Sequence, residues 1–380
     1  MSFNLSLADL EAGSRSPLIS RFEQLIAPCS PEQLEGLAAQ SSGITRQHFG
    51  KTMRLFAPLY LSNECVNNCQ YCGFSRDNPI LRVTLTVDQV RAEAEHLAGQ
   101  GFRNVLLVAG EHPKFVSDGY LEACIGAIKE FIPSVALEVG PMETPEYRRM
   151  VDAGSETLVV YQETYHREIY QELHTSGPKK NFDWRIDCPE RAYQGGYRRI
   201  GIGALFGLAE WRYEALRLAA HLEYLYKHCW KAAFTVSFPR MRPAAGGYQP
   251  TYSLSDPEFV QMLSAFRICF PQVGIVLSTR EAPGLRDALI PLGVTMMSAG
   301  SHTEPGGYTG EGKDDLHLTV RGRRVELEEA AKPCSSKATD ATGQFDIADE
   351  RSPNEIADLL KQQGFDPVWK DWDVSILTPS

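Results

Sequence analysis

The sequence of 380 residues has no block of lysine and arginine and no long apolar run. Its 38 basic residues against 48 acidic ones leave a net charge of −10, which gives a nucleic-acid partner no electrostatic support. No stretch approaches the roughly 18 apolar residues of a membrane span, and the N-terminus has neither a basic start nor an apolar core. We therefore expect a cytoplasmic protein that acts on a small molecule, with no nucleic-acid and no membrane partner.

Cysteine is also scarce, since nine residues are an odd number and too few for a disulfide scaffold. Six of them have no ligand-like spacing, and we expect these to be buried, reduced thiols: Cys29, Cys124, Cys188, Cys229, Cys269 and Cys334. The other three, Cys65, Cys69 and Cys72, share the stretch CVNNCQYCGF. Their close spacing makes this stretch the strongest candidate for a metal site.

The middle of the chain repeats a β/α pattern. Short apolar runs rich in β-branched or aromatic residues are each followed by a polar loop and a segment of helical period. The eight runs are MRLFAPLYL, NVLLVAG, SVALEVG, ETLVVYQ, RIGIGAL, AFTVSFP, GIVLST and GVTMMSAG. Alternating strands and helices predict a parallel sheet, and eight units predict a closed (β/α)8 barrel of the TIM type. An open doubly wound sheet is the alternative.

Three regions follow from this pattern. We expect residues 1–50 to form a helical N-terminal extension, residues 51–300 the barrel, and residues 301–380 a C-terminal region packed on it. Residues from 301 to about 353 are rich in glycine, charge and small polar side chains, which predicts a long loop. A helix near residues 353–363 should follow, and then a tail whose tryptophans, Trp369 and Trp372, pack on the barrel.

Three clustered cysteines leave a metal site incomplete. Thiolates favour zinc, copper(I) or iron–sulfur clusters. A zinc site needs further ligands at close spacing, and His48 and His112 are each too isolated to complete it. A cubic [4Fe–4S] cluster also takes four ligands, so three cysteines would leave one iron open to a substrate or cofactor. The cluster is the favoured interpretation, and a zinc-binding structural protein is the alternative.

The C-x3-C-x2-C spacing, with Tyr71 just before the third cysteine and GF after it, resembles the signature of radical S-adenosylmethionine enzymes. In that family S-adenosylmethionine chelates the open iron, and one electron cleaves it to a 5′-deoxyadenosyl radical. The resemblance therefore implies one [4Fe–4S] cluster on Cys65, Cys69 and Cys72, bound S-adenosylmethionine, and an external one-electron reductant of the flavodoxin or ferredoxin type.

Further motifs over about residues 45–373 narrow the resemblance: PLYLSNEC, CGFS, GEH, YQETYH, GIGALFGL, SFPRMRP, LSTRE, PGGY and VWKDWD. Together they resemble the aromatic amino-acid lyase branch, and within it the tyrosine lyases of thiamine-thiazole synthesis. This implies hydrogen abstraction from the amino nitrogen of L-tyrosine, cleavage of its Cα–Cβ bond to p-cresol and dehydroglycine, and a thiazole synthase as protein partner.

Several alternatives remain open. The related lyase of [FeFe]-hydrogenase maturation carries a C-terminal cysteine motif, whereas this sequence has no cysteine after Cys334. A tryptophan lyase and a deazaflavin-cofactor synthase are more distant alternatives. A non-lyase radical enzyme, such as a methylthiotransferase, would share the cluster but leave tyrosine intact. A binding module of a thiazole-synthesis assembly would suit the acidic surface but would not explain the cysteines.

The substrate residues should follow the strands, because chemistry in a barrel gathers in the loops at the carboxyl ends of its strands. The resemblance places Tyr60 beside the substrate amine. Arg280 in LSTRE would hold the carboxylate, since a guanidinium donates two parallel hydrogen bonds, and Ser298 would add a hydroxyl. A surface ion pair with Glu281 is the alternative for Arg280.

The cofactor residues are expected at the ends of other strands. Glu111 would accept from the methionyl ammonium, Glu163 would face the adenosine, and Arg185, ranked ahead of Arg191, would pair with the methionyl carboxylate. The remaining candidates are Tyr71 beside the cluster, Gly201 and Gly203, which would let adenine approach the fifth strand, and Arg240 and Arg242, either of which would face the substrate.

Overall fold

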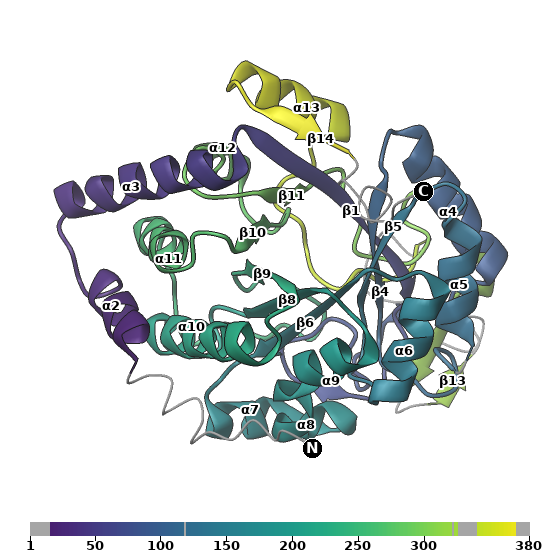
Figure 1. Cartoon of the computed structure of the whole chain (residues 1–380). Helices are drawn as coiled ribbons and strands as arrows, with labels where there is room; N and C mark the ends of the chain where they lie inside the picture. The colour runs from purple at the N-terminus through teal and green to yellow at the C-terminus, as the bar shows by residue number, and fades with distance from the viewer. Residues whose placement is uncertain (1–15, 118, 321–322, 326–339, 370–380) are drawn as a thin grey trace.

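The computed structural model describes residues 16–117, 119–320, 323–325 and 340–369. Its centre is a barrel of eight strands, all paired in parallel and closed by pairing of β11 with β1 (Figure 1). The barrel strands are β1 (Thr52–Ser62), β4 (Asn104–Ala109), β5 (Ser134–Glu138), β6 (Thr157–Glu163), β8 (Arg199–Ala204), β9 (Ala233–Ser237), β10 (Gly274–Leu277) and β11 (Met296–Ser298). The predicted closed barrel is confirmed, and the open-sheet alternative is wrong.

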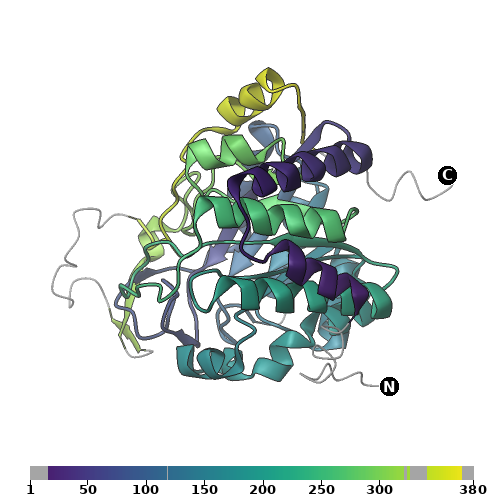
Figure 2. The same ribbon diagram turned by 90° about the vertical axis from the view of Figure 1, so that its left-hand side faces the viewer.

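Helices between the strands cover the outside of the barrel (Figures 1 and 2). They are α4 (Val87–Gly99), α5 (Tyr120–Ile128), α6 (Thr144–Ala153), α7 (Arg167–Leu173), α8 (Phe182–Ile186), α9 (Cys188–Gly195), α10 (Trp211–His228), α11 (Asp256–Cys269) and α12 (Pro283–Leu289). Capping boxes start several of them, as where the side chains of Thr86 and Gln89 each bond the other's backbone N–H at the start of α4. None of the helices in the described part of the chain combines the length and apolar character needed to cross a bilayer.

Two helices precede the barrel, α2 (Pro17–Leu25) and α3 (Pro31–Phe49). Each follows a serine N-cap and begins with proline, which has the backbone geometry of a first helical turn. They lie along α10 and α11 on the outside of the barrel (Figure 2). Phe22 of α2 packs edge-on against Phe266 of α11, with ring centroids 4.7 Å apart. The helices expected before the barrel are therefore present.

The chain after residue 300 holds more structure than the expected long loop. The 3-10 helix η2 (Lys313–Asp315) leads into β12 (His317–Val320), which pairs antiparallel with β13 (Arg323–Val325) and with β3 (Leu81–Arg82). These strands are too short to show an alternating pattern in the sequence. The predicted helix is confirmed as α13 (Pro353–Gln362).

The C-terminal tail also adds an unexpected strand, β14 (Asp366–Val368), which pairs in parallel with the start of β1. Trp369 then packs against Phe102, with ring centroids 5.2 Å apart, as expected of the first tryptophan. Trp372 lies outside the described residues.

Two short strands beside the barrel, β2 (Asn68–Cys69) and β7 (His174–Ser176), pair with each other, and the 3-10 helix η1 (Pro178–Lys180) follows β7.

Most of the isolated cysteines are buried as predicted, namely Cys124, Cys188, Cys229 and Cys269. The prediction is wrong for Cys29, which is exposed because it lies in the link between α2 and α3, outside the packed layers. Cys334 lies outside the described residues.

Residues 341–351, which we call the strap, run across the mouth of the barrel at the carboxyl ends of its strands. At one end, the N–H of Thr342 donates to the carbonyl of Leu81 at 3.0 Å. Towards the other end, the N–H of Ala348 donates to the carbonyl of Thr279 at 2.9 Å. The strap is thereby tied to both sides of the mouth.

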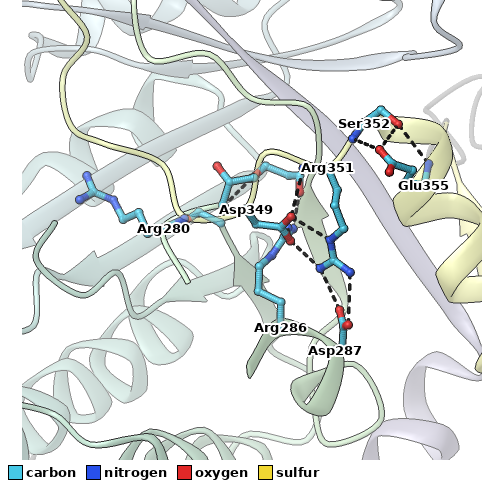
Figure 3. A network of polar contacts seen from close by, with 10 residues as sticks. Arg280, Arg286, Asp287, Asp349, Arg351, Ser352 and Glu355 are labelled. Atoms are coloured by element: carbon cyan, nitrogen blue, oxygen red, sulfur yellow. Dashed lines mark hydrogen bonds and ion pairs between the residues drawn. The ribbon is translucent and has the colours of Figure 1, made fainter. Parts of the chain in front are cut away.

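A buried ionic network fixes the far end of the strap (Figure 3). Asp349 pairs with Arg286, and both side chains are fully buried. Arg351 donates to Asp349 at 2.6 Å and to Asp287 at 2.8 Å. Loss of one partner of a buried pair typically costs about 3–5 kcal/mol, because the other charge is left uncompensated. The network therefore holds the strap in one position.

Candidate active site

The three clustered cysteines lie between β1 and β3, in what we call the cysteine loop, with Cys69 at the end of the short strand β2, and their thiols are free. Arg82, fully buried, shapes this loop by donating to four of its backbone carbonyls, those of Asn63, Phe74, Ser75 and Asn78. The side chain of Asn78 donates in turn to the carbonyl of Cys72 at 3.0 Å. The loop is held by hydrogen bonds rather than by a disulfide, so its thiols are available as ligands.

Cys65, Cys69 and Cys72 all line one cavity of about 90 Å³, which we call the cysteine chamber. Burial raises the pKa of the Cys65 and Cys69 thiols, so thiolates there need a cation or a metal to be stable. Asn67 links the loop to the barrel, since its amide donates to Glu111 at 2.7 Å and lies 3.6 Å from the sulfur of Cys65.

Glu163 enters the cysteine chamber from the end of β6. It sits at a shift in the register between β6 and β8, and its φ of 73° is the one positive value among the described residues other than glycine. Buried Glu214 of α10 stabilises this turn by accepting from the hydroxyl of Thr164 and from the N–H of Tyr165. The bulge thus turns the carboxylate of Glu163 into the chamber.

Two cations face Glu163. Lys179 donates to its carboxylate at 2.6 Å, and Arg185 lies 3.4 Å from the same oxygen. Burial would raise the pKa of Glu163, but these two cations outweigh it and lower that pKa. Arg191, the alternative to Arg185, instead donates to backbone carbonyls of Met142 and Trp184. Sequence reasoning missed Lys179, which lies in η1 and follows no apolar run.

Glu138 was also not predicted from the sequence. It ends β5, and Glu111 was chosen because site residues in a barrel lie at the carboxyl ends of the strands. Glu138 lines both the cysteine chamber and the cavity beside it. Burial and the nearby charge of Glu163 raise its pKa to about 7, against the opposing effect of Arg280. A carboxyl group in this state can hold or release a proton near neutral pH.

Replacing Glu138 with glutamine is expected to stabilise the cluster-free protein at pH 8 and to have little effect at pH 4.5. Because the folded-state pKa of about 7 exceeds the ordinary value of 4.5, the folded state holds the extra proton between these values, and stability falls as pH rises through this window. The gain at pH 8 should be roughly 2–3 kcal/mol. Denaturant unfolding at both pH values measures it, with exposed Glu35→Gln as the control. An equal gain at both pH values would contradict this assignment.

A second cavity of about 50 Å³, the arginine chamber, adjoins the first. The two share Cys72, Glu138, Glu163, Lys179 and Gln344 in their walls. Arg280 lies in the arginine chamber with its guanidinium 3.3 Å from the centroid of the Phe345 ring, and it points away from the network that anchors the strap (Figure 3). Among described residues, none bonds to this guanidinium.

The proposed ion pair of Arg280 with Glu281 is wrong. Glu281 instead accepts from Arg240 at 2.8 Å, and Arg240 also pairs with Asp256 at 2.7 Å. Arg240 is thereby fully engaged outside the chambers. Arg242, by contrast, lines the arginine chamber. Of the two arginines, Arg242 is therefore the one that lines a chamber.

Neither Tyr60 nor Ser298 lines a chamber. The hydroxyl of Tyr60 lies behind the shared wall and donates to Gln344, which lines both chambers, at 2.8 Å. Ser298 lines neither chamber; its hydroxyl accepts from the N–H of Thr279 at 3.1 Å. Ser298 therefore supports the turn that carries Arg280.

The remaining candidates lie at the margins. Tyr71 lines the arginine chamber, and its hydroxyl bonds to His174 at 2.8 Å. Gly203 packs under Tyr161, where a Cβ would come within 2.7 Å of the ring, so the close approach requires glycine. Gly201 faces the lower interior of the barrel beside Thr235 and lines neither chamber. The structure does not bring Gly201 to the cysteines.

Comparison with known proteins agrees with this geometry. The family model for the Radical SAM superfamily matches residues 59–219, and that for the Biotin and Thiamin Synthesis associated domain matches residues 237–366. The barrel and its three-cysteine loop are those of a radical S-adenosylmethionine enzyme, a class that implies a [4Fe–4S] cluster and S-adenosylmethionine. The chain is 39% identical to the 2-iminoacetate synthase of Escherichia coli (strain K12) over 369 residues, 96% of this chain and 91% of the relative. It belongs to the 2-iminoacetate synthase family.

Solved structures show the same fold. The FeFe-hydrogenase maturase HydG from Carboxydothermus hydrogenoformans is similar with 37% identity and a TM-score of 0.81, over 96% of this chain and 78% of HydG. The methylornithine synthase PylB has a TM-score of 0.69 at 21% identity, which is a likeness of fold alone.

The cysteine chamber fits the cluster that this class implies. Its sulfur ligands are the soft donors that iron–sulfur clusters take. Among the described residues, no three histidine, cysteine, aspartate or glutamate side chains converge as a single metal ion would require. The rest of the chamber offers both carboxylates and cations, as a zwitterionic cofactor needs.

Proposed function

We infer that this protein cleaves the Cα–Cβ bond of L-tyrosine to 2-iminoacetate (dehydroglycine) and p-cresol, with formation of 5′-deoxyadenosine. The observation that carries this function is the 39% identity to a 2-iminoacetate synthase over 96% of the chain. The guanidinium of Arg280 in the chamber beside the cysteines, to which none of the described residues hydrogen-bonds, supports it, because a free amino acid presents a carboxylate to be held.

The cysteine chamber is proposed to bind the cofactors. Cys65, Cys69 and Cys72 would hold the [4Fe–4S] cluster. Glu111 would accept from the methionyl ammonium of S-adenosylmethionine, and Arg185 with Glu163 would face its carboxylate and its adenosine. When bound, the cluster and S-adenosylmethionine supply a carbon radical that removes a hydrogen atom from the substrate.

The arginine chamber is proposed to bind the substrate. Arg280 would hold the carboxylate of tyrosine, and Tyr60 would lie beside its amino group. Ser298 would act indirectly through the backbone of Thr279, and Tyr71 would form part of the wall. Because the strap crosses the mouth, it would restrict the access of water to the chambers, as a reactive carbon radical requires.

The test is anaerobic incubation of the reconstituted protein with S-adenosylmethionine, reductant and either tyrosine or tryptophan. Tyrosine is expected to yield p-cresol and deoxyadenosine in step. A brown, cluster-bearing protein that consumes S-adenosylmethionine but leaves tyrosine intact would contradict the proposed function. Turnover of tryptophan in preference to tyrosine would favour the tryptophan-lyase alternative.

Further partners follow from the chemistry of the reaction. Cleavage of S-adenosylmethionine consumes an electron, so we propose a flavodoxin or ferredoxin as donor. An imine of this kind hydrolyses readily in water, so we propose delivery to a thiazole synthase, with both proteins in the reducing cytoplasm. Co-purification tests this delivery: no association, with glyoxylate as the sole product even in cell extract, would count against it.

A further inference from the structure

Two adjacent residues of the strap, Gln344 and Phe345, reach the chambers from above. Gln344 lines both chambers, and Phe345 lines the arginine chamber. Neither residue ends a barrel strand, so the rule that located the other site residues does not find them. Each contacts a residue already assigned to the substrate, Gln344 through Tyr60 and Phe345 through Arg280.

The backbone of Gln344 is fixed on two sides. Its N–H donates to the carbonyl of Thr303 at 3.0 Å. Its carbonyl lies so close to the cysteine loop that a Cβ at Gly73 would come within 2.3 Å of it. Only glycine permits this approach, so the side chain of Gln344 starts from a rigid point between the strap and the cysteine loop.

The hydrogen bond between Tyr60 and Gln344 has a direction. The phenol of Tyr60 donates its single proton to Gln344 Oε1 at 2.8 Å. Burial raises the pKa of Tyr60 well above its ordinary value, so the phenol keeps that proton. With the proton engaged, the oxygen of Tyr60 is left as an acceptor only. An acceptor is what the ammonium or amine of an amino acid, a donor, requires.

The contact between Phe345 and Arg280 also determines which part of the guanidinium faces the chamber. A guanidinium carbon 3.3 Å from the ring centroid is in face-to-face stacking distance. The N–H groups of a guanidinium lie in its plane, so stacking on one face leaves its donor edge open to the chamber. A carboxylate can then accept two parallel hydrogen bonds from that edge.

We propose that the strap positions the two polar ends of the substrate. Gln344 orients Tyr60 as the acceptor for the substrate amino group, and Phe345 orients Arg280 as the donor to the carboxylate. Both are positioning residues that act through their neighbours. This inference rests on the proposed function, because it takes an aromatic amino acid as the substrate.

The experiment pairs two variants with three ligands. Gln344→Leu and Phe345→Leu are prepared as cluster-loaded proteins, with Gln362→Leu, an exposed position on α13, as the matched control. Without reductant, calorimetry measures binding of tyrosine, of 3-(4-hydroxyphenyl)propionate, which lacks the amino group, and of tyramine, which lacks the carboxylate. Iron content and thermal unfolding report whether each variant is intact.

The two variants are expected to weaken the binding of different ligands. Gln344→Leu should weaken the binding of tyrosine and of tyramine about tenfold and leave the binding of the propionate unchanged. Phe345→Leu should weaken the binding of tyrosine and of the propionate about fivefold and leave the binding of tyramine unchanged. In a Tyr60→Phe background, Gln344→Leu should add less than about a twofold further loss, because its effect passes through the tyrosine hydroxyl. Gln362→Leu should change none of these affinities.

Equal weakening of all three ligands would overturn the proposal, since it would indicate general damage to the pocket. Unchanged tyrosine binding in both variants would overturn it as well. If Gln344→Leu does not bind its cluster, Gln344→Met is measured in its place, and Phe345→Leu is measured as before. A wild-type enzyme that binds tyrosine but forms no p-cresol would refute the proposed function instead, and the ligand pattern would still decide the role of the strap.

Discussion

Arg280→Ala is expected to abolish most tyrosine cleavage while the cluster and its spectrum remain. Arg280 lines the arginine chamber and not the cysteine chamber, so its loss should leave cofactor binding intact. Loss of a charge-assisted pair with a buried carboxylate costs about 3–5 kcal/mol, on the order of a hundredfold or more in tyrosine affinity. Slow cleavage of S-adenosylmethionine should continue without p-cresol.

Arg280→Lys should restore little, because an ammonium cannot reproduce the paired donors of a guanidinium or its stack on Phe345. The measurement is the rate of p-cresol formation beside that of deoxyadenosine formation. If both rates fall in parallel at saturating tyrosine, Arg280 acts on the cofactor instead. If neither rate falls, Arg280 has no role in catalysis.

Replacement of Cys65, Cys69 or Cys72 with alanine is expected to abolish activity entirely. Each would provide one of three sulfur ligands in a single chamber, and no other cysteine of the described part of the chain lines that chamber. A cluster that lacks one of its protein ligands loses the geometry that leaves a single iron open for the cofactor. Iron content, the visible spectrum and deoxyadenosine formation should all fall together.

The remaining cysteines provide the control. Cys29→Ala, at an exposed position, and Cys269→Ala, at a buried one, should retain the cluster and activity. Full activity from any variant of the Cys65, Cys69 and Cys72 set would refute the cluster assignment. Loss of activity in Cys29→Ala with full iron content would point to a second functional thiol.

The barrel was predictable because its strands are continuous apolar runs, a pattern set by burial of both faces in a parallel sheet. The same regularity located Glu111, Glu163 and Arg280, which follow strands directly. Glu138 obeys the same rule and was overlooked. Short strands such as β12 and β14 left no pattern, because three or four residues cannot establish a period.

Other parts of the site could not be read from the sequence. Lys179 and Gln344 reach the chambers from segments outside the barrel strands, and only the folded chain brings them there. Ser298 ends a strand but turns its hydroxyl to the backbone of Thr279, which a strand pattern does not reveal. The apolar pattern shows at which end of a strand a residue lies, but the direction of its side chain depends on tertiary contacts.

The strap also has a consequence for the order in which the molecule matures. Tyr60 and Gln344 are separated by 284 residues, so their contact is among the most non-local in the chain. Contacts of this kind form late, because a long loop must close before they contribute. The cysteine loop and all eight barrel strands are synthesised before the ribosome reaches residue 341. In this order the mouth of the barrel stays uncovered until the strap docks, and Gln344 and Phe345 are the last residues to complete the walls of the arginine chamber.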